Sequence, residues 1–199
     1  MGVFKNIRIE STILILLTLS IFISFSLDLS IFNYFENFNK NPNNKYLKEF
    51  FTNITELGDS VWYFGICIIF ILIFFVNKKT KLITKNSPEK IFNFFISAFV
   101  YLLFVGVITQ VVKHIIGRPR PNYTNLNDAF NFNFLSFDST LHSFPSGHSS
   151  TIFIVCLLIG SVLPKLKYFF YFLASIVALS RVVVGAHFFT DVVAGFLLA

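Results

Sequence analysis

The stretch Phe144–Ser150, which reads FPSGHSS, is a short polar break directly before a long apolar run. Pro145 stops any helix that precedes it, Gly147 permits a tight turn, and hydroxyl side chains are typical of a helix start. Such a turn leaves several backbone N–H groups unpaired at a helix N-terminus, where an anion can bind. We therefore expect an apolar helix to begin here, with His148 in a first turn that faces an anionic group.

The composition around this stretch is that of an integral membrane protein. Of 199 residues, 55% are hydrophobic and 13% are charged, and the mean hydropathy is +0.71. These values exclude an ordinary soluble domain and a disordered chain. The net charge of +6 fits attraction to anionic lipid head groups. The sequence has no basic helix of the kind that binds nucleic acid, so we expect no nucleic-acid partner. Cys67 and Cys156 both lie in apolar runs, so we expect small core residues there.

Apolar runs divide the chain into membrane spans. The predicted spans cover residues 13–32, 61–76, 92–116, 149–163, 168–184 and 191–199. The last has only nine residues, roughly 13 Å of helix, against a hydrocarbon core of about 30 Å. The sequence thus predicts one all-α domain over residues 1–199, a polytopic transmembrane helical bundle of about six spans with the last short or truncated.

An amphipathic helix is predicted between the first two spans. Its apolar residues recur at spacings of three and four, and they are Leu47, Phe50, Phe51, Ile54 and Leu57. This pattern is typical of a helix that lies in the membrane interface, and Gly58 is expected to end it.

Basic residues predict the orientation of the bundle. The segment 77–90 carries five lysines and one glutamate, and such a loop stays cytoplasmic. Counting spans from this loop places the N-terminus, with Lys5 and Arg8, and the turn with Lys165 and Lys167 on the same cytoplasmic side. Residues 113–120, 145–148 and 181–191 then meet at the outer face. We expect a bacterial inner (cell) membrane, with the site on the periplasmic face.

The first of these outer segments carries Lys113 and Arg120 at a helix end closed by Gly117, Pro119 and Pro121. A lysine supplies a point charge and an arginine a planar fork, and both suit phosphate oxygens. The alternative is a helix end whose cationic side chains extend to the membrane–water interface.

The third segment contains Arg181, His187 and Asp191. On a helix, His187 and Asp191 would share a face, and the carboxylate would fix one ring nitrogen and leave the other free as a nucleophile. The alternative is a structural His–Asp pair.

A metal site has to be weighed against an anion site. His148, His187 and Asp191 could form a two-histidine, one-carboxylate site. Three cations in the same constellation, Lys113, Arg120 and Arg181, would repel a metal ion and attract an anion, so we expect neither metal nor cofactor. His114 and His142 are interpreted as a helix-end and a loop residue. Arg118 is interpreted as an optional helper in anion binding.

The three segments together resemble the signature of the type 2 phosphatidic acid phosphatase superfamily. The matching residues are Lys113 with Arg120-Pro121, then Pro145-Ser146-Gly147-His148, then Ser180-Arg181 with His187 and Asp191. The resemblance implies a helical bundle, usually of six spans, that removes phosphate from lipids without a metal.

The resemblance also implies a role for each matching residue. His187 would attack phosphorus, Asp191 would orient His187, and His148 would protonate the leaving group. The phosphate oxygens would be held by Lys113, Arg120, Arg181, Ser146 and the Gly147 N–H.

Three other functions remain compatible with these motifs. They are a lipid phosphotransferase on the same scaffold, a vanadate-dependent haloperoxidase, which the membrane spans disfavour, and a non-enzymatic transport protein. The candidate substrates are undecaprenyl diphosphate, phosphatidylglycerophosphate, phosphatidic acid and lipid A. The sequence does not indicate an oligomeric state.

Overall fold

A computed structural model describes residues 2–80, 88–123 and 129–199, with side chains from residue 18 onward apart from residues 79, 80 and 88. Helices and the loops that join them make up these parts of the chain. The α-helices are α1 (Gly2–Lys40), α2 (Lys45–Ile54), α3 (Ser60–Thr80), α4 (Pro88–Ile116), α5 (Gly147–Val162), α6 (Lys167–Val183) and α7 (Phe189–Leu198). The predicted all-α class is confirmed.

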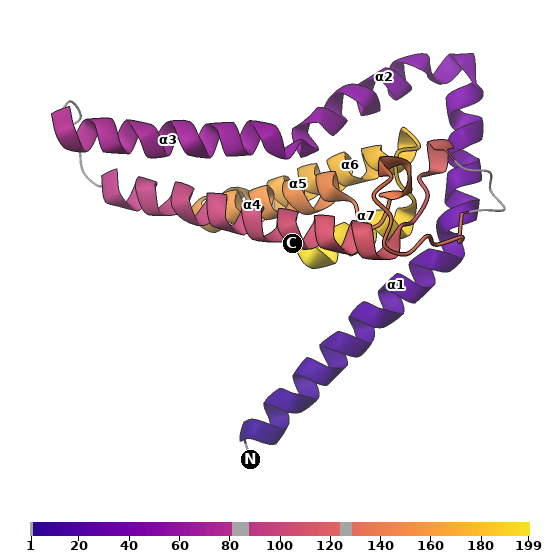
Figure 1. The fold of residues 1–199 in the computed structure, drawn as a ribbon, viewed down its shortest axis with the longest axis horizontal. Coiled ribbons are helices and arrows are strands. Elements are labelled where there is room, and N and C mark those ends of the chain that lie inside the picture. The colour runs from indigo at the N-terminus through magenta and orange to yellow at the C-terminus, as the bar shows by residue number, and fades with distance from the viewer. Residues whose placement is uncertain (1, 81–87, 124–128) are drawn as a thin grey trace.

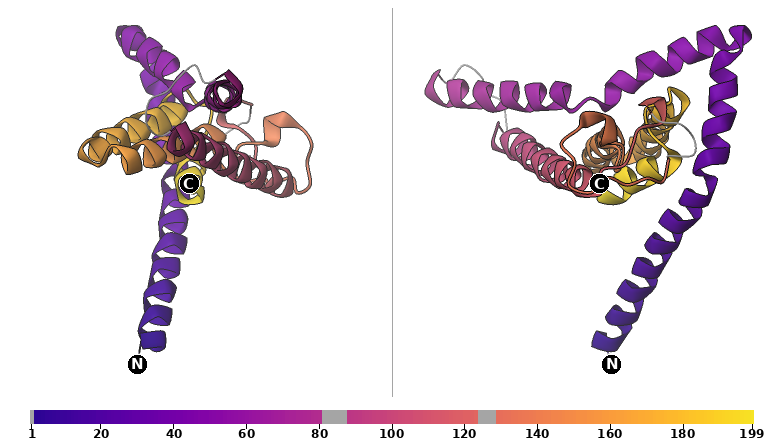
Figure 2. Two further views of the ribbon diagram at one scale, coloured as in Figure 1. Left: turned by 90° about the vertical axis from the view of Figure 1, so that its left-hand side faces the viewer. Right: turned by 45° about the vertical axis from the view of Figure 1, so that its right-hand side comes forward.

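The helices pack as two hairpins, with α1 crossing one end (Figure 1). Helices α3 and α4 run side by side, α5 packs mainly against α6, and α4 joins the hairpins through α5. Helix α7 lies against α5 and against α1. The N-terminal part of α1 extends away from the other helices (Figure 2).

The six predicted apolar runs all form helices, but the helices differ in length. Four helical segments are long and apolar enough to span a membrane: Thr18–Lys40, Pro42–Lys78, Glu89–Tyr123 and Pro164–Val183. Helices α5 and α7 are apolar but have only 16 and 10 residues. Length alone therefore supports four crossings among the described residues, and the chain is an integral membrane protein.

Helix α1 continues past its predicted end at residue 32 to Lys40. Polar residues extend the helix because they have partners there: Asn39 Nδ2 donates to the Val183 carbonyl at 2.6 Å. Lys40 pairs with Glu36 one turn earlier at 2.7 Å. Tertiary contact with α6 thus overrides the loop that the local sequence favours.

The predicted amphipathic helix forms as α2, followed by a 3₁₀ turn over Thr55–Gly58. Tyr46, Leu47 and Phe50 are exposed, whereas Ile54 packs on the core between α5 and α6. The turn Thr55–Gly58 also contacts α5 and α6, so it brings the start of α3 against the two helices that carry the site.

The core is built from small and branched side chains between the helices. Ala174 and Val177 of α6 are fully buried against Ile152 and Cys156 of α5. Cys67 lies in the α3–α4–α5 core, so both cysteines are buried and free, as predicted. Most of the predicted lysine loop, residues 81–87, lies outside the described residues, and so do residues 124–128.

Candidate active site

Four helix ends meet around one cavity of about 320 Å³. They are the C-terminal ends of α4 and α6 and the N-terminal ends of α3 and α5, and His187 reaches the cavity from the loop before α7. The predicted site residues that line the cavity are Lys113, Arg120, Gly147, His148, Arg181 and His187. The fold therefore brings three segments that are far apart in the sequence to one place.

Three cations line this cavity, and their hydrogen bonds are incomplete. Lys113 Nζ donates to the His142 carbonyl at 2.7 Å, and Arg181 Nη1 donates to Thr55 Oγ1 at 2.9 Å. The Nε atoms of Arg120 and Arg181 are buried and have no hydrogen-bond partner within the described part of the chain. A buried donor without an acceptor is costly, so an anion in the cavity would complete the site.

His148 lies in the first turn of α5, on the cavity wall. The turn that ends at Gly58 packs directly on it, because a Cβ atom at position 58 would lie 2.9 Å from His148 Cβ and 3.1 Å from its Cδ2. Only a residue without a side chain fits there. The segment between α2 and α3 therefore sets the position of the His148 ring.

Ser146 has a different place from the one predicted. It is fully buried and does not line the cavity. Its hydroxyl caps α5, accepting from Ser149 N at 3.4 Å and from Ser149 Oγ at 2.9 Å. The backbone of α7 approaches so closely that a Cβ at Gly195 would lie 2.5 Å from the Ser146 carbonyl oxygen. Ser146 thus shapes the turn, whereas Gly147 faces the cavity.

His187 is held from one side by Asp191. Its Nδ1 lies 3.5 Å from Asp191 Oδ2 and 3.5 Å from Ser143 Oγ. The same Asp191 oxygen accepts from Ser143 Oγ at 2.5 Å and from the Phe188 N–H at 2.9 Å. Since Nδ1 faces Asp191, the other nitrogen, Nε2, is left for the cavity.

His187 and Asp191 do not meet on one face of a helix, although their spacing predicts it. His187 precedes α7, which begins at Phe189. Asp191 is in the first turn of α7, and its carboxylate folds back over the helix start to cap the Phe188 N–H. A capping interaction therefore creates the contact that we had expected from the i, i+4 spacing on a helix.

Burial sets the protonation state of His187. The residue is 3% exposed, and burial lowers the pKa of its imidazole to about 3, although Asp191 acts in the opposite direction. The ring is thus neutral at physiological pH, as a nucleophile requires.

Arg118 is not a cavity residue, contrary to its interpretation as a helper in anion binding. It is fully buried behind the cavity, where Nη1 donates to Asp191 Oδ1 and Nη2 donates to Asp28 Oδ2, both at 2.7 Å. Its guanidinium carbon lies 4.3 Å from the centre of the Phe188 ring. Both terminal nitrogens of its guanidinium already bind carboxylates of the protein, so Arg118 orients Asp191 and is not placed to bind an anion in the cavity.

Asp28 and Ser143 were not singled out from the sequence. For Asp28 a signal existed, because an acid in the middle of an apolar span is costly and marks function. Ser143 carries no comparable signal.

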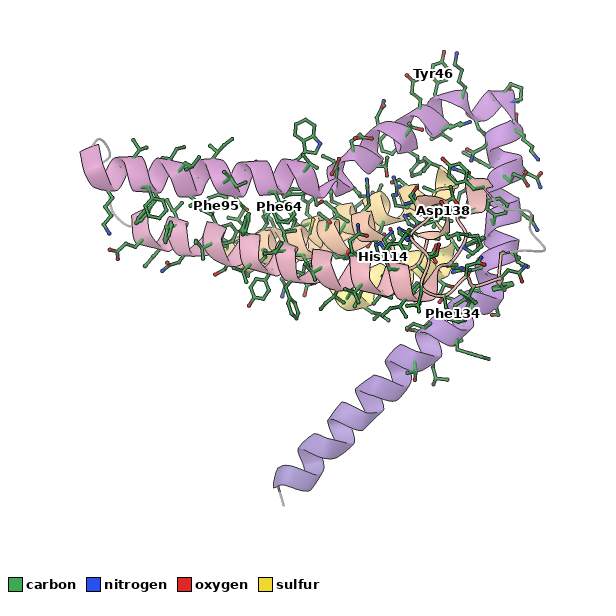
Figure 3. All side chains as sticks on the ribbon, viewed as in Figure 1. Tyr46, Phe64, Phe95, His114, Phe134 and Asp138 are labelled. Atoms are coloured by element: carbon green, nitrogen blue, oxygen red, sulfur yellow. The ribbon has the colours of Figure 1, made fainter. Side chains whose placement is uncertain are left out.

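His142 and His114 also have roles that the sequence did not indicate. The backbone carbonyl of His142 accepts from Lys113, and the His142 ring lies 4.3 Å from that of His114. His114 lies in the last turn of α4 and is labelled in Figure 3. Among the described residues, no group of three or more His, Cys, Asp or Glu side chains converges as a metal site would require.

Comparison with known proteins places these residues in a family. The model of the PAP2 superfamily matches residues 94–199. A lipid A 1-phosphatase of Rhizobium etli is 33% identical over 154 residues, which is 75% of this chain and 65% of that protein. Phosphatidylglycerophosphatase B of Bacillus subtilis is 30% identical over 167 residues, 77% of this chain and 70% of that protein. The chain spans 65% and 59% of the length of the two lipid A 1-phosphatases that it matches.

Solved structures show the same fold. The crystal structure of a transmembrane PAP2-type phosphatidylglycerolphosphate phosphatase from Bacillus subtilis superposes with a TM-score of 0.60 at 25% identity, covering 92% of this chain and 89% of that one. Aquifex aeolicus LpxE shares the fold with a TM-score of 0.60 at 21% identity, covering 86% of this chain and 89% of its own. The family match covers more than half of the sequence and includes every predicted site residue, so the chain belongs to the PAP2 superfamily.

Proposed function

We propose that this protein is a membrane lipid phosphatase that works through a phosphohistidine on His187. One observation carries the proposal: the buried Nε groups of Arg120 and Arg181 lack acceptors among the described residues, and both side chains line the cavity that holds His148 and His187. A phosphate group would supply the missing acceptors within reach of a neutral imidazole.

The charge of the cavity supports this choice. Lys113, Arg120 and Arg181 line it, whereas Asp59 is the acidic residue on its wall, with one oxygen accepting from the Val61 N–H. Cations fixed in a partly buried site stabilise phosphate oxygens and the charge that builds up in phosphoryl transfer. The Gly147 N–H at the start of α5 adds a donor at a helix N-terminus.

The proposed reaction has two steps. Burial lowers the pKa of His148 to about 4 in the ligand-free protein, so the negative charge of the bound phosphate must first favour its protonation. His187 Nε2 then forms a bond to phosphorus while the bond from phosphorus to the lipid oxygen breaks, and that oxygen takes the proton from His148. Water then attacks phosphorus, His148 takes a proton from it, and the P–N bond breaks to release phosphate and restore His187. Asp191 stabilises the charge that His187 carries between these steps.

An apolar groove beside the cavity supports a lipid substrate. The groove has a volume of about 620 Å³ and shares Phe64, Gly106 and Gln110 with the cavity. Phe64 lies between α3 and α4 in Figure 3. We propose that an acyl chain lies in this groove while its terminal phosphate enters the cavity. The matching relatives are named for lipid A and phosphatidylglycerophosphate, so these are the first candidates.

We further propose that the site opens on the outer face of a bacterial inner membrane. The cavity lies at the C-terminal ends of α4 and α6, whereas Lys165 and Lys167 lie at the opposite end of α6. Basic residues favour the cytoplasmic side, so the site would face outward.

Phosphate release from four lipids tests the proposal. The purified protein in detergent is given undecaprenyl diphosphate, phosphatidylglycerophosphate, phosphatidic acid and lipid A. We expect release from at least one, with activity nearly abolished in His187→Ala and in His148→Ala. Wild-type rates in either variant would overturn the assignment, and so would transfer of the phosphate to another hydroxyl in place of its release.

A further inference from the structure

Asp28 is an acid buried inside the apolar part of α1. Its side chain has no exposed surface and accepts hydrogen bonds from two different segments of the chain. One is Arg118, whose Nη2 lies 2.7 Å from Oδ2. The other is Thr190, whose backbone N–H and hydroxyl both lie 2.8 Å from the carboxylate. A buried carboxylate is stable only when it is paired in this way.

Both partners of Asp28 lead directly to Asp191. Arg118 donates from Nη2 to Asp28 Oδ2 and from Nη1 to Asp191 Oδ1, at 2.7 Å each. Thr190 is the residue next to Asp191 in the first turn of α7. Asp28 therefore holds Arg118, the side-chain partner of Asp191, and also the backbone of Thr190, the residue before Asp191.

The fork geometry makes the two carboxylates interdependent. Arg118 places Nη1 on Asp191 Oδ1 and Nη2 on Asp28 Oδ2, so its positive charge is shared between two carboxylates. Without the charge of Asp28, Arg118 is attracted to Asp191 alone, which would pull this carboxylate away from His187. The distance from Asp191 Oδ2 to His187 Nδ1 is already 3.5 Å, so a small displacement breaks the interaction.

We propose that Asp28 is a positioning residue for His187, acting through Arg118 and through the first turn of α7. This inference rests on the proposed role of His187 as nucleophile. Asp28 lies outside residues 94–199, the part that matches the family model. Helix α1 would then be a component of the active site as well as a membrane anchor.

The first experiment compares Asp28→Asn with Ser24→Ala, a matched control one turn earlier on the same helix. Ser24 is also buried, but its hydroxyl donates only to the Ile21 carbonyl of its own helix. We expect kcat to fall about 10- to 100-fold in Asp28→Asn, as for other partners that orient a histidine. KM and the Ki for inorganic phosphate should stay within about twofold, because Lys113, Arg120 and Arg181 keep their places.

A second readout needs no turnover. The chain has four histidines, so the side-chain ¹⁵N resonances of His187 can be assigned by substitution. We expect the Nδ1 resonance of His187 to move in Asp28→Asn and to stay unchanged in Ser24→Ala. If the wild type releases no phosphate, the proposed function fails, and this measurement still decides whether Asp28 controls His187.

Thr190→Val keeps the charges and removes one hydrogen bond to Asp28, so it covers the case in which Asp28→Asn does not fold. We expect a fall in kcat of about 3- to 10-fold with an unchanged Ki for phosphate. The proposal would be overturned if a folded Asp28→Asn variant, or Thr190→Val where Asp28→Asn does not fold, showed an unshifted His187 resonance or a kcat within twofold of wild type. A parallel rise in the Ki for phosphate would also overturn the proposal, because it would mean general damage to the site.

Discussion

A methyl group at Gly58 should impair catalysis by displacing His148. The Cβ of Gly58→Ala would lie 2.9 Å from His148 Cβ, whereas ordinary van der Waals contact begins at 3.4 Å, so one side must move by about 0.5 Å. Gly58 is the buried last residue of the turn Thr55–Gly58, and Arg181 donates to Thr55 at the start of that turn. The movement is therefore expected at the His148 ring.

The size of the effect follows from that displacement. A misplacement of about 1 Å at a reacting group costs about 100-fold in rate, so 0.5 Å should cost about tenfold, or ~1.4 kcal/mol of transition-state stabilisation. We expect the loss in kcat, because His148 is proposed to act on the leaving group and not to bind the lipid. Steady-state phosphate release from the best lipid substrate, measured over a range of concentrations, gives kcat and KM separately.

Gly65→Ala is the matched control. It introduces the same methyl group into α3, but beyond the adjoining residues and backbone of α3 itself no heavy atom of the described residues lies within 4 Å of the new Cβ. Its kcat should stay within about twofold of wild type. If Gly58→Ala behaves like Gly65→Ala, the close packing on His148 has no catalytic consequence and the reasoning is refuted.

Three further predictions concern the anion site and its chemistry. Arg181→Lys should raise the Ki for inorganic phosphate about 10- to 100-fold, because a point charge cannot replace the planar fork, whereas Lys165→Gln at the far end of α6 should leave it unchanged. Burial lowers the pKa of His187 to about 3, which keeps the ring neutral well above that pH. A ¹⁵N titration of the ligand-free protein should therefore show no protonation of His187 between about pH 5 and pH 8. A titration midpoint near 6.5 would contradict this prediction. Activity should stay within about twofold after treatment with EDTA, because lysine and arginine side chains, and not a metal ion, are proposed to stabilise the phosphate oxygens. A loss of activity that added Mg²⁺ restores would disprove this prediction.

The sequence predicted the helices well where hydrophobicity decides the structure. Each apolar run became a helix, and the residues at the polar helix ends converged because successive spans alternate in direction. The end of α1 could not be predicted, since Asn39 extends that helix through a bond to Val183, far away in the sequence. Local polarity favours a loop there, and only the tertiary contact reverses that preference.

The cavity residues were easier to predict than the residues behind them. Lysines, arginines and histidines at the ends of membrane helices that are predicted to face outward attract notice by their type alone. Arg118 and Asp28 are 90 positions apart, and nothing in either local sequence says that they meet. Ser146 shows the converse problem, because a hydroxyl that suits phosphate suits a helix cap equally well, and the structure places it in the cap.

A covalent phosphate on His187 is the most direct test of the account. The protein would be mixed with lipid substrate carrying labelled phosphate, quenched in alkali within milliseconds, and digested for mass spectrometry. We predict label on His187 in the wild type and none in His187→Ala. Phosphate release without any labelled intermediate, or label on a different residue, would contradict the proposed mechanism.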